Sequence, residues 1–307
     1  MKTYRIKIVD AFTKKQFAGN PAGVVLDANG LTDGQMQFIA RELNLSETAF
    51  ILPSTEPNAN LRIRWFTPVG EVSLCGHATI AGFHALAEEG MEGMRTNGQH
   101  YFQLQTKSGI LAVRVEKNFY DTTVEFELPT PAFKIKKTLS AKLMQSLGIA
   151  GKEMKKDLPI VTDSYLYIPV NRLKVIEKLQ PEFLTLAREL AKMKVEGVCV
   201  FSLETKDKDS SVHSRFFAPN FGINEDPVTG SSNGPLGFYL HRYVLPAGYT
   251  VAYREMPNGG MEFIGEQGDY LKRPGRVRIR LRVKQNAVED ISIAGEAVTM
   301  LDATLKM

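Results

Sequence analysis

The pentapeptide RWFTP occupies residues 64–68, and the similar pentapeptide RFFAP occupies residues 215–219. Each copy is followed by a turn-rich stretch, a small residue before Gly, and then a helix-like run that begins with small residues. In this alignment Cys-Gly-His at residues 75–77 corresponds to Thr-Gly-Ser at residues 229–231, an offset of 229 − 75 = 154 in a chain of 307 residues. Self-similarity at half the length of the chain predicts a duplicated domain.

Short runs with period-two alternation, bounded by Gly, Pro, Asn and Asp, predict strands along both halves. The runs are YRIKIVD, AGVVLD, LRIRWF, LAVRV and TVEFELP in the first half, and GVCVFS, VHSRFFAP, TVAYREM, VRIRLRV and DISIAG in the second. Helices are predicted at residues 32–44 with a Thr-x-x-Gln capping box, 77–89 before Gly90, 181–193 with Pro in the first turn, and 233–243. Because they do not alternate regularly with strands, the fold class is α+β and not a doubly wound sheet.

The composition excludes several classes of protein. A net charge of +4, spread along the chain, is too weak to indicate nucleic-acid binding. The two cysteines, Cys75 and Cys199, favour a reducing compartment over a disulfide scaffold. The first residues alternate like a strand and do not form a signal peptide, and no stretch approaches the roughly 20 apolar residues of a membrane span. We therefore expect a cytoplasmic protein whose partners are neither nucleic acids nor membranes.

The duplication predicts two half-domains, residues 1–125, to which the extreme C-terminus returns, and residues 126–307. Two halves that face each other would bring two helix N-termini to one cleft. The first turn of a helix has unpaired N–H groups and partial positive charge, and Gly there lets a ligand approach the backbone closely. We therefore expect a small anionic substrate, such as a carboxylate, in a cleft between the halves.

Three residues near the repeats have side chains suited to catalysis. Glu47 lies just past a predicted helix end, where an acidic residue either points into a cleft or solvates a turn. His77 is either a base or a packing group at a helix start. Cys75 is either a nucleophile activated by the helix N-terminus or a small buried residue. The residues alone leave these alternatives open.

Other chemistries find less support in the sequence. A two-thiol racemase needs a second cysteine at the paired position, which holds Thr229, while Cys199 lies in an apolar strand. Ser231 lacks the Gly-x-Ser-x-Gly elbow of a hydrolase. The histidines have no metal-ligand spacing, and no glycine pattern for a phosphate or dinucleotide follows a strand, so we predict no metal site.

Five motifs, in order, resemble the phenazine-biosynthesis PhzF-like family over essentially the whole chain. They are FAGNPAGVV (17–25), MQFIARELNLSETAF (36–50), RWFTPVGEVSLCGHAT (64–79), EDPVTGSSNG (225–234) and GEQGDYLKRPGRV (265–277). The resemblance implies the diaminopimelate epimerase-like fold, in which each of two pseudo-symmetric halves is a curved sheet around a central helix. It also implies a cofactor-independent isomerase, a biosynthetic role and a homodimer.

The resemblance assigns roles to particular residues. It implies that Glu47, in Ser-Glu-Thr, is the acid/base that removes a proton from carbon and returns it elsewhere, with His77 and Asp226 as further catalytic groups. The substrate-binding residues that it implies are Asn20, Gly76, Gly230 and Ser231. Two rival interpretations remain: an amino-acid epimerase or dehydratase that uses Cys75, and a non-catalytic protein that binds a small ligand. The substrate itself is not specified by the sequence.

Overall fold

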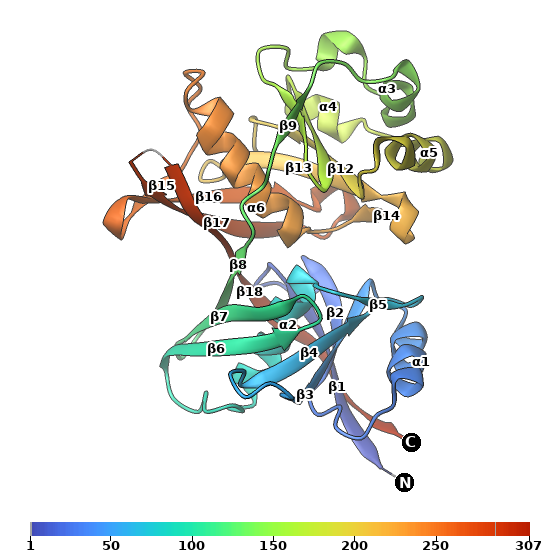
Figure 1. Cartoon of the computed structure of the whole chain (residues 1–307), viewed down its shortest axis with the longest axis vertical. Helices are drawn as coiled ribbons and strands as arrows, with labels where there is room; N and C mark the ends of the chain where they lie inside the picture. Colours follow the sequence, from blue (N-terminus) through green and yellow to red (C-terminus); the bar gives the residue numbers. More distant parts are fainter. Residues whose placement is uncertain (1, 286) are drawn as a thin grey trace. The chain divides into compact units, whose positions relative to one another are not determined.

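The structure is a computed structural model that describes residues 2–285 and 287–307 (Figure 1). Its contacts divide the chain into two compact units. Unit 1 comprises the described part of Met1–Glu127 together with Ser292–Met307, and unit 2 comprises the described part of Leu128–Ile291. Each unit combines strands with a few helices, which confirms the predicted α+β class.

Unit 1 is a sheet that closes into a ring. Its strands are β1 (Thr3–Ala11), β2 (Asn20–Val25), β3 (Glu47–Pro53), β4 (Leu61–Phe66), β5 (Glu71–Val72), β6 (Gly98–Thr106), β7 (Gly109–Lys117), β8 (Thr122–Leu128) and part of β18 (Ala287–Lys306). Pairing runs from β1 through β2, β3, β4, β6 and β7 to β8, and β18 pairs with both β8 and β1. The pairs β2–β3 and β4–β6 are parallel, so each needs a crossover connection.

Those two crossovers are the helices α1 (Asp33–Leu43) and α2 (Gly76–Glu88). The predicted capping box of α1 is present, since the side chains of Thr32 and Gln35 each accept a hydrogen bond from the other's backbone N–H. Nearly every residue of α2 is buried, as in a helix that is enclosed on all sides. Figure 1 shows the strands of unit 1 wrapped around α2.

Unit 2 repeats this plan. Its strands are β9 (Lys134–Lys136), β10 (Ile160–Thr162), β11 (Tyr165–Val170), β12 (Gly197–Ser202), β13 (Val212–Ala218), β14 (Ile223–Asp226), β15 (Arg254–Met256), β16 (Gly260–Gln267) and β17 (Gly275–Lys284). Its helices are α3 (Ala141–Leu147), α4 (Leu173–Glu177), α5 (Phe183–Met193) and α6 (Gly230–Tyr239), the last continued by a π-helical turn, and short 3-10 turns lie at 151–153, 219–221, 257–259 and 269–271. Parallel pairs β11–β12 and β13–β16 match β2–β3 and β4–β6, with α6 in the place of α2. The predicted pair of similar halves, each with a central helix, is confirmed.

The repeated pentapeptide has a structural role in both units. Arg64 on β4 donates to both carboxylate oxygens of Glu71 on β5, at 2.8 and 3.0 Å. Arg215 on β13 donates to both oxygens of Glu225 on β14, at 2.7 Å each. Such two-pronged pairs fix geometry as well as adding energy. The pentapeptide recurs because each copy ties a strand to the short strand that leads to the central helix.

The structure corrects details of the predicted elements. Pro181 precedes the cap residue Glu182 and so lies outside the first turn of α5. The last predicted helix begins earlier, at Gly230, so Pro235 lies inside it. The run TVAYREM contributes only Arg254–Met256 as a strand.

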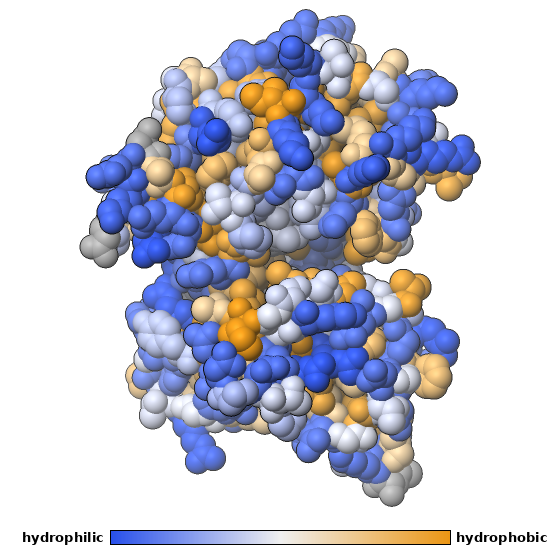
Figure 2. All heavy atoms as spheres, viewed as in Figure 1, coloured by the Kyte–Doolittle hydropathy of each residue, from blue (hydrophilic) through white to orange (hydrophobic). Residues whose placement is uncertain are grey.

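The described residues contain no helix that is long and apolar enough to cross a lipid bilayer. Figure 2 shows hydrophilic side chains over much of the face in view, interrupted by small hydrophobic patches. Scattered apolar side chains of this kind are normal on a protein surface.

Candidate active site

The end of helix α1 determines the position of Glu47. Asn44 follows the helix in the left-handed conformation (φ 50°), and its N–H donates to the carbonyl of Ala40. This stop lets the chain enter β3 within three residues, and Glu47 is the first residue of that strand, in register with Ala22 of β2. Glu47 is only 9% exposed. A carboxylate so placed is fixed by backbone pairing and largely shielded from water.

Cys75 and His77 lie at the N-terminal end of α2. Cys75 is the cap residue, has an extended backbone, and makes no side-chain capping bond. Its carbonyl accepts hydrogen bonds from the N–H and hydroxyl of Thr79, which fixes the start of the helix. Cys75 and His77 are 7% and 5% exposed. The first turn of α2 therefore places a thiol and an imidazole inside unit 1.

The structure brings these three side chains together. The Nε2 atom of His77 lies 3.4 Å from an Oε atom of Glu47, and its Nδ1 atom lies 3.4 Å from the Sγ atom of Cys75. The first distance exceeds the usual hydrogen-bond range of about 2.7–3.2 Å, so it is a close approach and not a standard hydrogen bond. The two ring nitrogens of His77 thus approach different neighbours, Nε2 the carboxylate and Nδ1 the thiol.

His77 is neutral at physiological pH. Burial lowers the pKa of its imidazole to about 3, because the cation would lose its hydration. A neutral imidazole carries one proton and one lone pair on its two ring nitrogens. The tautomer with its proton on Nε2 would direct an N–H toward Glu47 and accept from the thiol of Cys75 at Nδ1.

Asn20 and Gly76 belong to the same unit. Asn20 opens β2, is fully buried, and follows Gly19, whose backbone is left-handed (φ 60°). A Cβ on Gly19 would stand 2.1 Å from the carbonyl oxygen of Ala11, so only glycine fits this turn. Gly76 is the first residue of α2. The glycine turn before Asn20 fixes where β2 begins.

The remaining predicted residues lie in unit 2, at the start of α6. Thr229 caps this helix, and its hydroxyl donates to the carboxylate of Asp226 at the end of β14. Gly230 and Ser231 form the first turn, and the hydroxyl of Ser231 lies 3.0 Å from that of Tyr165. Asp226 is 7% exposed. Unit 2 therefore groups an acid, three hydroxyls and a helix N-terminus.

Gln267, on β16, was missed by the sequence analysis. Its Nε2 donates to the carbonyl of Asp226 at 2.8 Å and to the hydroxyl of Thr229 at 3.0 Å. Its Oε1 accepts from the backbone N–H of Thr229 and from Asn233, at 3.1 and 2.9 Å. The signal in the sequence was its place in the motif GEQGDYLKRPGRV (265–277), to which no site residue was assigned. Gln267 holds the start of α6 against β16.

Phe66 and Phe217, which belong to the two repeated pentapeptides, are core residues. Phe66 packs with α1 and β1 residues in unit 1, and Phe217 packs in the core between α3, α5 and their strands in unit 2. Phe17 and Phe221 are instead 65% and 53% exposed.

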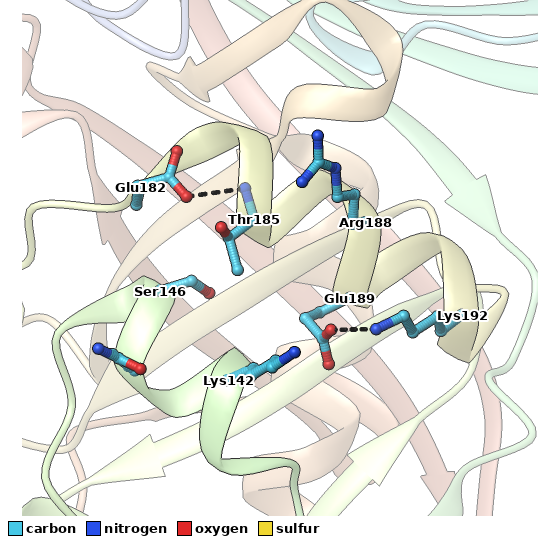
Figure 3. Close-up of a pocket in the computed structure, with 8 residues that line it drawn as sticks. Lys142, Ser146, Glu182, Thr185, Arg188, Glu189 and Lys192 are labelled. Atoms are coloured by element: carbon cyan, nitrogen blue, oxygen red, sulfur yellow. Dashed lines mark hydrogen bonds and ion pairs between the residues drawn. The ribbon is translucent and has the colours of Figure 1, made fainter.

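A surface pocket of about 480 Å³ lies between α3 and α5 of unit 2 (Figure 3). The two carboxylates that line this pocket already form structural hydrogen bonds. Glu182 caps α5 by accepting from the N–H groups of Leu184 and Thr185, and Glu189 pairs with Lys192 and with Ser140. The pocket contains none of the residues that the sequence suggested for catalysis.

Comparisons with known proteins find relatives along the whole chain. The PhzC-PhzF family model, described as phenazine biosynthesis-like protein, matches residues 9–303. An uncharacterized isomerase of Clostridium acetobutylicum is 37% identical over 311 residues, which are 99% of each chain. The crystal structure of a Bacillus anthracis phenazine biosynthesis protein of the PhzF family matches with a TM-score of 0.86 and 33% identity, over 100% of both chains.

A more distant structure extends the likeness in fold. A hydroxyproline epimerase from Agrobacterium vitis has a TM-score of 0.63 at 12% identity, over 99% of this chain and 91% of the epimerase. This similarity concerns the fold alone. Together with the closer match, it confirms the epimerase-like fold that the motifs implied.

Proposed function

Because the chain belongs to the PhzC-PhzF family of phenazine biosynthesis-like proteins, we propose that it is an isomerase that moves a proton between carbons of a small carboxylate-bearing substrate. Its curated relatives bear the name isomerase, which supports this reaction class. The observation that carries the proposal is the buried carboxylate of Glu47, 3.4 Å from the neutral imidazole of His77.

In the proposed reaction Glu47 takes a proton from a C–H bond of the substrate. The electron pair of that bond enters the adjoining π system, and a proton from the Glu47 carboxyl group is returned to another carbon. The atoms of substrate and product are the same and no electrons are gained or lost, so the step requires no redox partner. A site that excludes water favours it, since little water competes for the proton.

His77, with its proton on Nε2, would hold the carboxylate of Glu47 in position. In unit 1, N–H groups near Gly76 at the N-terminus of α2 would bind a negative charge of the substrate. In unit 2, the N-terminus of α6 offers donors of the same kind near Gly230 and Ser231. We further propose that Asp226 assists protonation and that Asn20 contacts the substrate.

Hydrogen–deuterium exchange at carbon tests the proposal. The protein is incubated in D₂O with a panel of small cyclic and α-amino carboxylates, and NMR follows deuterium entry. Glu47→Gln should lower the exchange rate by about 10²–10⁴-fold, the usual contribution of a positioned acid/base. The matched control is Glu116→Gln, an exposed carboxylate on β7, which should leave exchange unchanged. Exchange that survives in Glu47→Gln would end the carboxylate mechanism.

A second candidate is an epimerase or dehydratase in which Cys75 is the base. The 3.4 Å approach of its sulfur to His77 favours it, because a neighbouring imidazole can accept the thiol proton. Cys75→Ser separates the two: exchange would vanish if the thiol were the base and would remain measurable if Glu47 were. Ligand-induced thermal shifts without exchange in any variant would instead indicate a protein that only binds.

A further inference from the structure

Glu47, Cys75 and His77 bring three kinds of metal-ligating atom to one buried place in unit 1. One such atom from each side chain lies within 4.8 Å of the other two. The sequence alone predicts no metal site, because its histidines have no ligand spacing. Here the ligands are of three different types, and Glu47 lies 28 residues before Cys75 (75 − 47).

The donor set indicates which ion would fit. Thiolate, imidazole and carboxylate are the three side-chain ligands of zinc, and the sulfur disfavours calcium and magnesium, which take oxygen ligands. Thiolate and carboxylate together also neutralise the charge of a divalent ion. With three protein ligands, the fourth coordination position of a tetrahedral ion stays open for water, as in catalytic zinc sites.

One spacing within the group matches what zinc requires, and the others lie within reach of it. Bonds of about 2.0–2.3 Å to a tetrahedral ion place neighbouring ligand atoms about 3.3–3.8 Å apart. His77 lies 3.4 Å from Glu47 through Nε2 and 3.4 Å from Cys75 through Nδ1, so an ion bound to either ring nitrogen has one neighbouring ligand at this spacing. The widest separation is at most 4.8 Å, which a modest turn of one side chain would shorten.

We propose that Glu47, Cys75 and His77 form a binding site for one thiophilic divalent cation, zinc above all, and that the bound ion prevents turnover. The inhibition of turnover rests on the proposed function, because the ion would occupy the carboxylate that acts as the base. The binding of the ion does not rest on it.

Cobalt(II) is the spectroscopic probe for the site. The reduced full-length protein is freed of metal with EDTA, exchanged into chelator-free buffer and titrated with Co²⁺. We expect one ion per chain, a sulfur-to-cobalt charge-transfer band in the near ultraviolet, and visible bands of tetrahedral intensity. One equivalent of Zn²⁺ should remove them. A protein that develops no charge-transfer band would overturn the proposal.

Variants assign the ligands. Cys75→Ser should lose the charge-transfer band. His77→Gln should weaken Zn²⁺ binding at least about tenfold, because even the loss of a residue that only hydrogen-bonds to a metal ligand weakens binding by that factor. The matched controls are Cys199→Ser, a thiol in β12 whose pKa burial raises to about 12, and His100→Gln on the exposed part of β6. Both controls should bind as the wild type does. A band that persists in Cys75→Ser would refute the site, and circular dichroism confirms that each variant is folded.

The effect on turnover is measured separately. Zn²⁺ added to the deuterium-exchange assay should abolish exchange at one equivalent, and EDTA should restore it. If the spectra show a bound ion while exchange continues, the metal-binding site is supported and the proposed inhibition of turnover is refuted. If metal-free protein exchanges no compound of the panel, the inhibition falls with the proposed function, and the cobalt spectra alone decide the site.

Discussion

Burial determines the charge of the His77 imidazole, which lies beside Glu47. The unfolded chain holds this imidazole at its ordinary pKa of about 6.5, whereas burial lowers the pKa to about 3 in the folded protein. The unfolded state therefore binds the proton first as the pH falls. Stability is unaffected by His77 above about pH 6.5 and decreases between pH 6.5 and 3.

His77→Gln should remove this part of the acid sensitivity. Between pH 6.5 and 5 a single group with these two pKa values costs the folded state about 2 kcal/mol. Urea unfolding of wild type and variant at pH 7 and pH 5 measures the difference. An equal loss in both proteins would show that the imidazole is protonated in the folded state.

Ser231 is the residue that tests the proposed carboxylate site on unit 2. Its hydroxyl stands in the first turn of α6, where a negative group would also meet N–H donors. A hydrogen bond to a charged group contributes about 1.5–3 kcal/mol, so Ser231→Ala should raise the KM of a carboxylate found by exchange about 10–100-fold. The value of kcat should change less. A fall in kcat at constant KM would assign Ser231 to the chemical step instead.

At the scale of elements, the two central helices differ in how tightly they are packed. In α6, a Cβ on Gly237 would stand 2.3 Å from Cγ2 of Ile279 on β17. In α2, a Cβ on Gly82 would meet Ile63 of β4 at 3.4 Å, an ordinary contact. The alternation of β17, with Val277, Ile279 and Leu281 buried and its arginines on the opposite face, presents Ile279 to α6.

Gly237→Ala should therefore destabilise the protein by about 1–3 kcal/mol, the usual cost of overpacking. Gly82→Ala is the matched control and should be neutral or gain up to about 1 kcal/mol, because Ala has the higher helix propensity. Urea unfolding compares the two. Equal effects would mean that β17 moves away from α6 without cost.

At the scale of the whole molecule, the ring of unit 1 depends on the last residues of the chain. The part of β18 within Ser292–Met307 pairs with β1 from Ala297 to Lys306, and β18 also pairs with β8. Ile293, Ala294 and Ala297 of this segment are buried. Removing it would leave two strand edges without partners and expose apolar surface.

A chain that ends at Ile291 should therefore fail to fold unit 1. Trp65, the single tryptophan, is fully buried in β4 and reports on this unit alone. Its fluorescence emission should shift to the red in the shortened chain, and should stay blue in a chain that lacks only Met307. A blue emission without the C-terminal strand would show that the ring closes without β18.

The sequence by itself determined the elements and their duplication. Period-two alternation, the capping box at Thr32 and the repeated pentapeptide are local signals, and local signals specify strands, helix starts and a repeat wherever the chain then goes. They also singled out Glu47 and His77 as candidates, through motifs that the family shares. The start of α6 was not determined locally: the helix begins at Gly230, where the side chain of Gln267, far along the chain, accepts a hydrogen bond from the backbone N–H of the cap residue Thr229.

Only the tertiary structure decided what these residues can do together. Glu47 and His77 are 30 residues apart (77 − 47), and β3 and α2 must both pack in unit 1 before their side chains approach to 3.4 Å. The same packing brings Cys75 to the imidazole, so that three side chains without ligand spacing in the sequence place atoms of metal-ligating type within 4.8 Å of one another. It also buries His77, which sets its charge. Proximity and burial are properties of the packed core, and no local pattern encodes them.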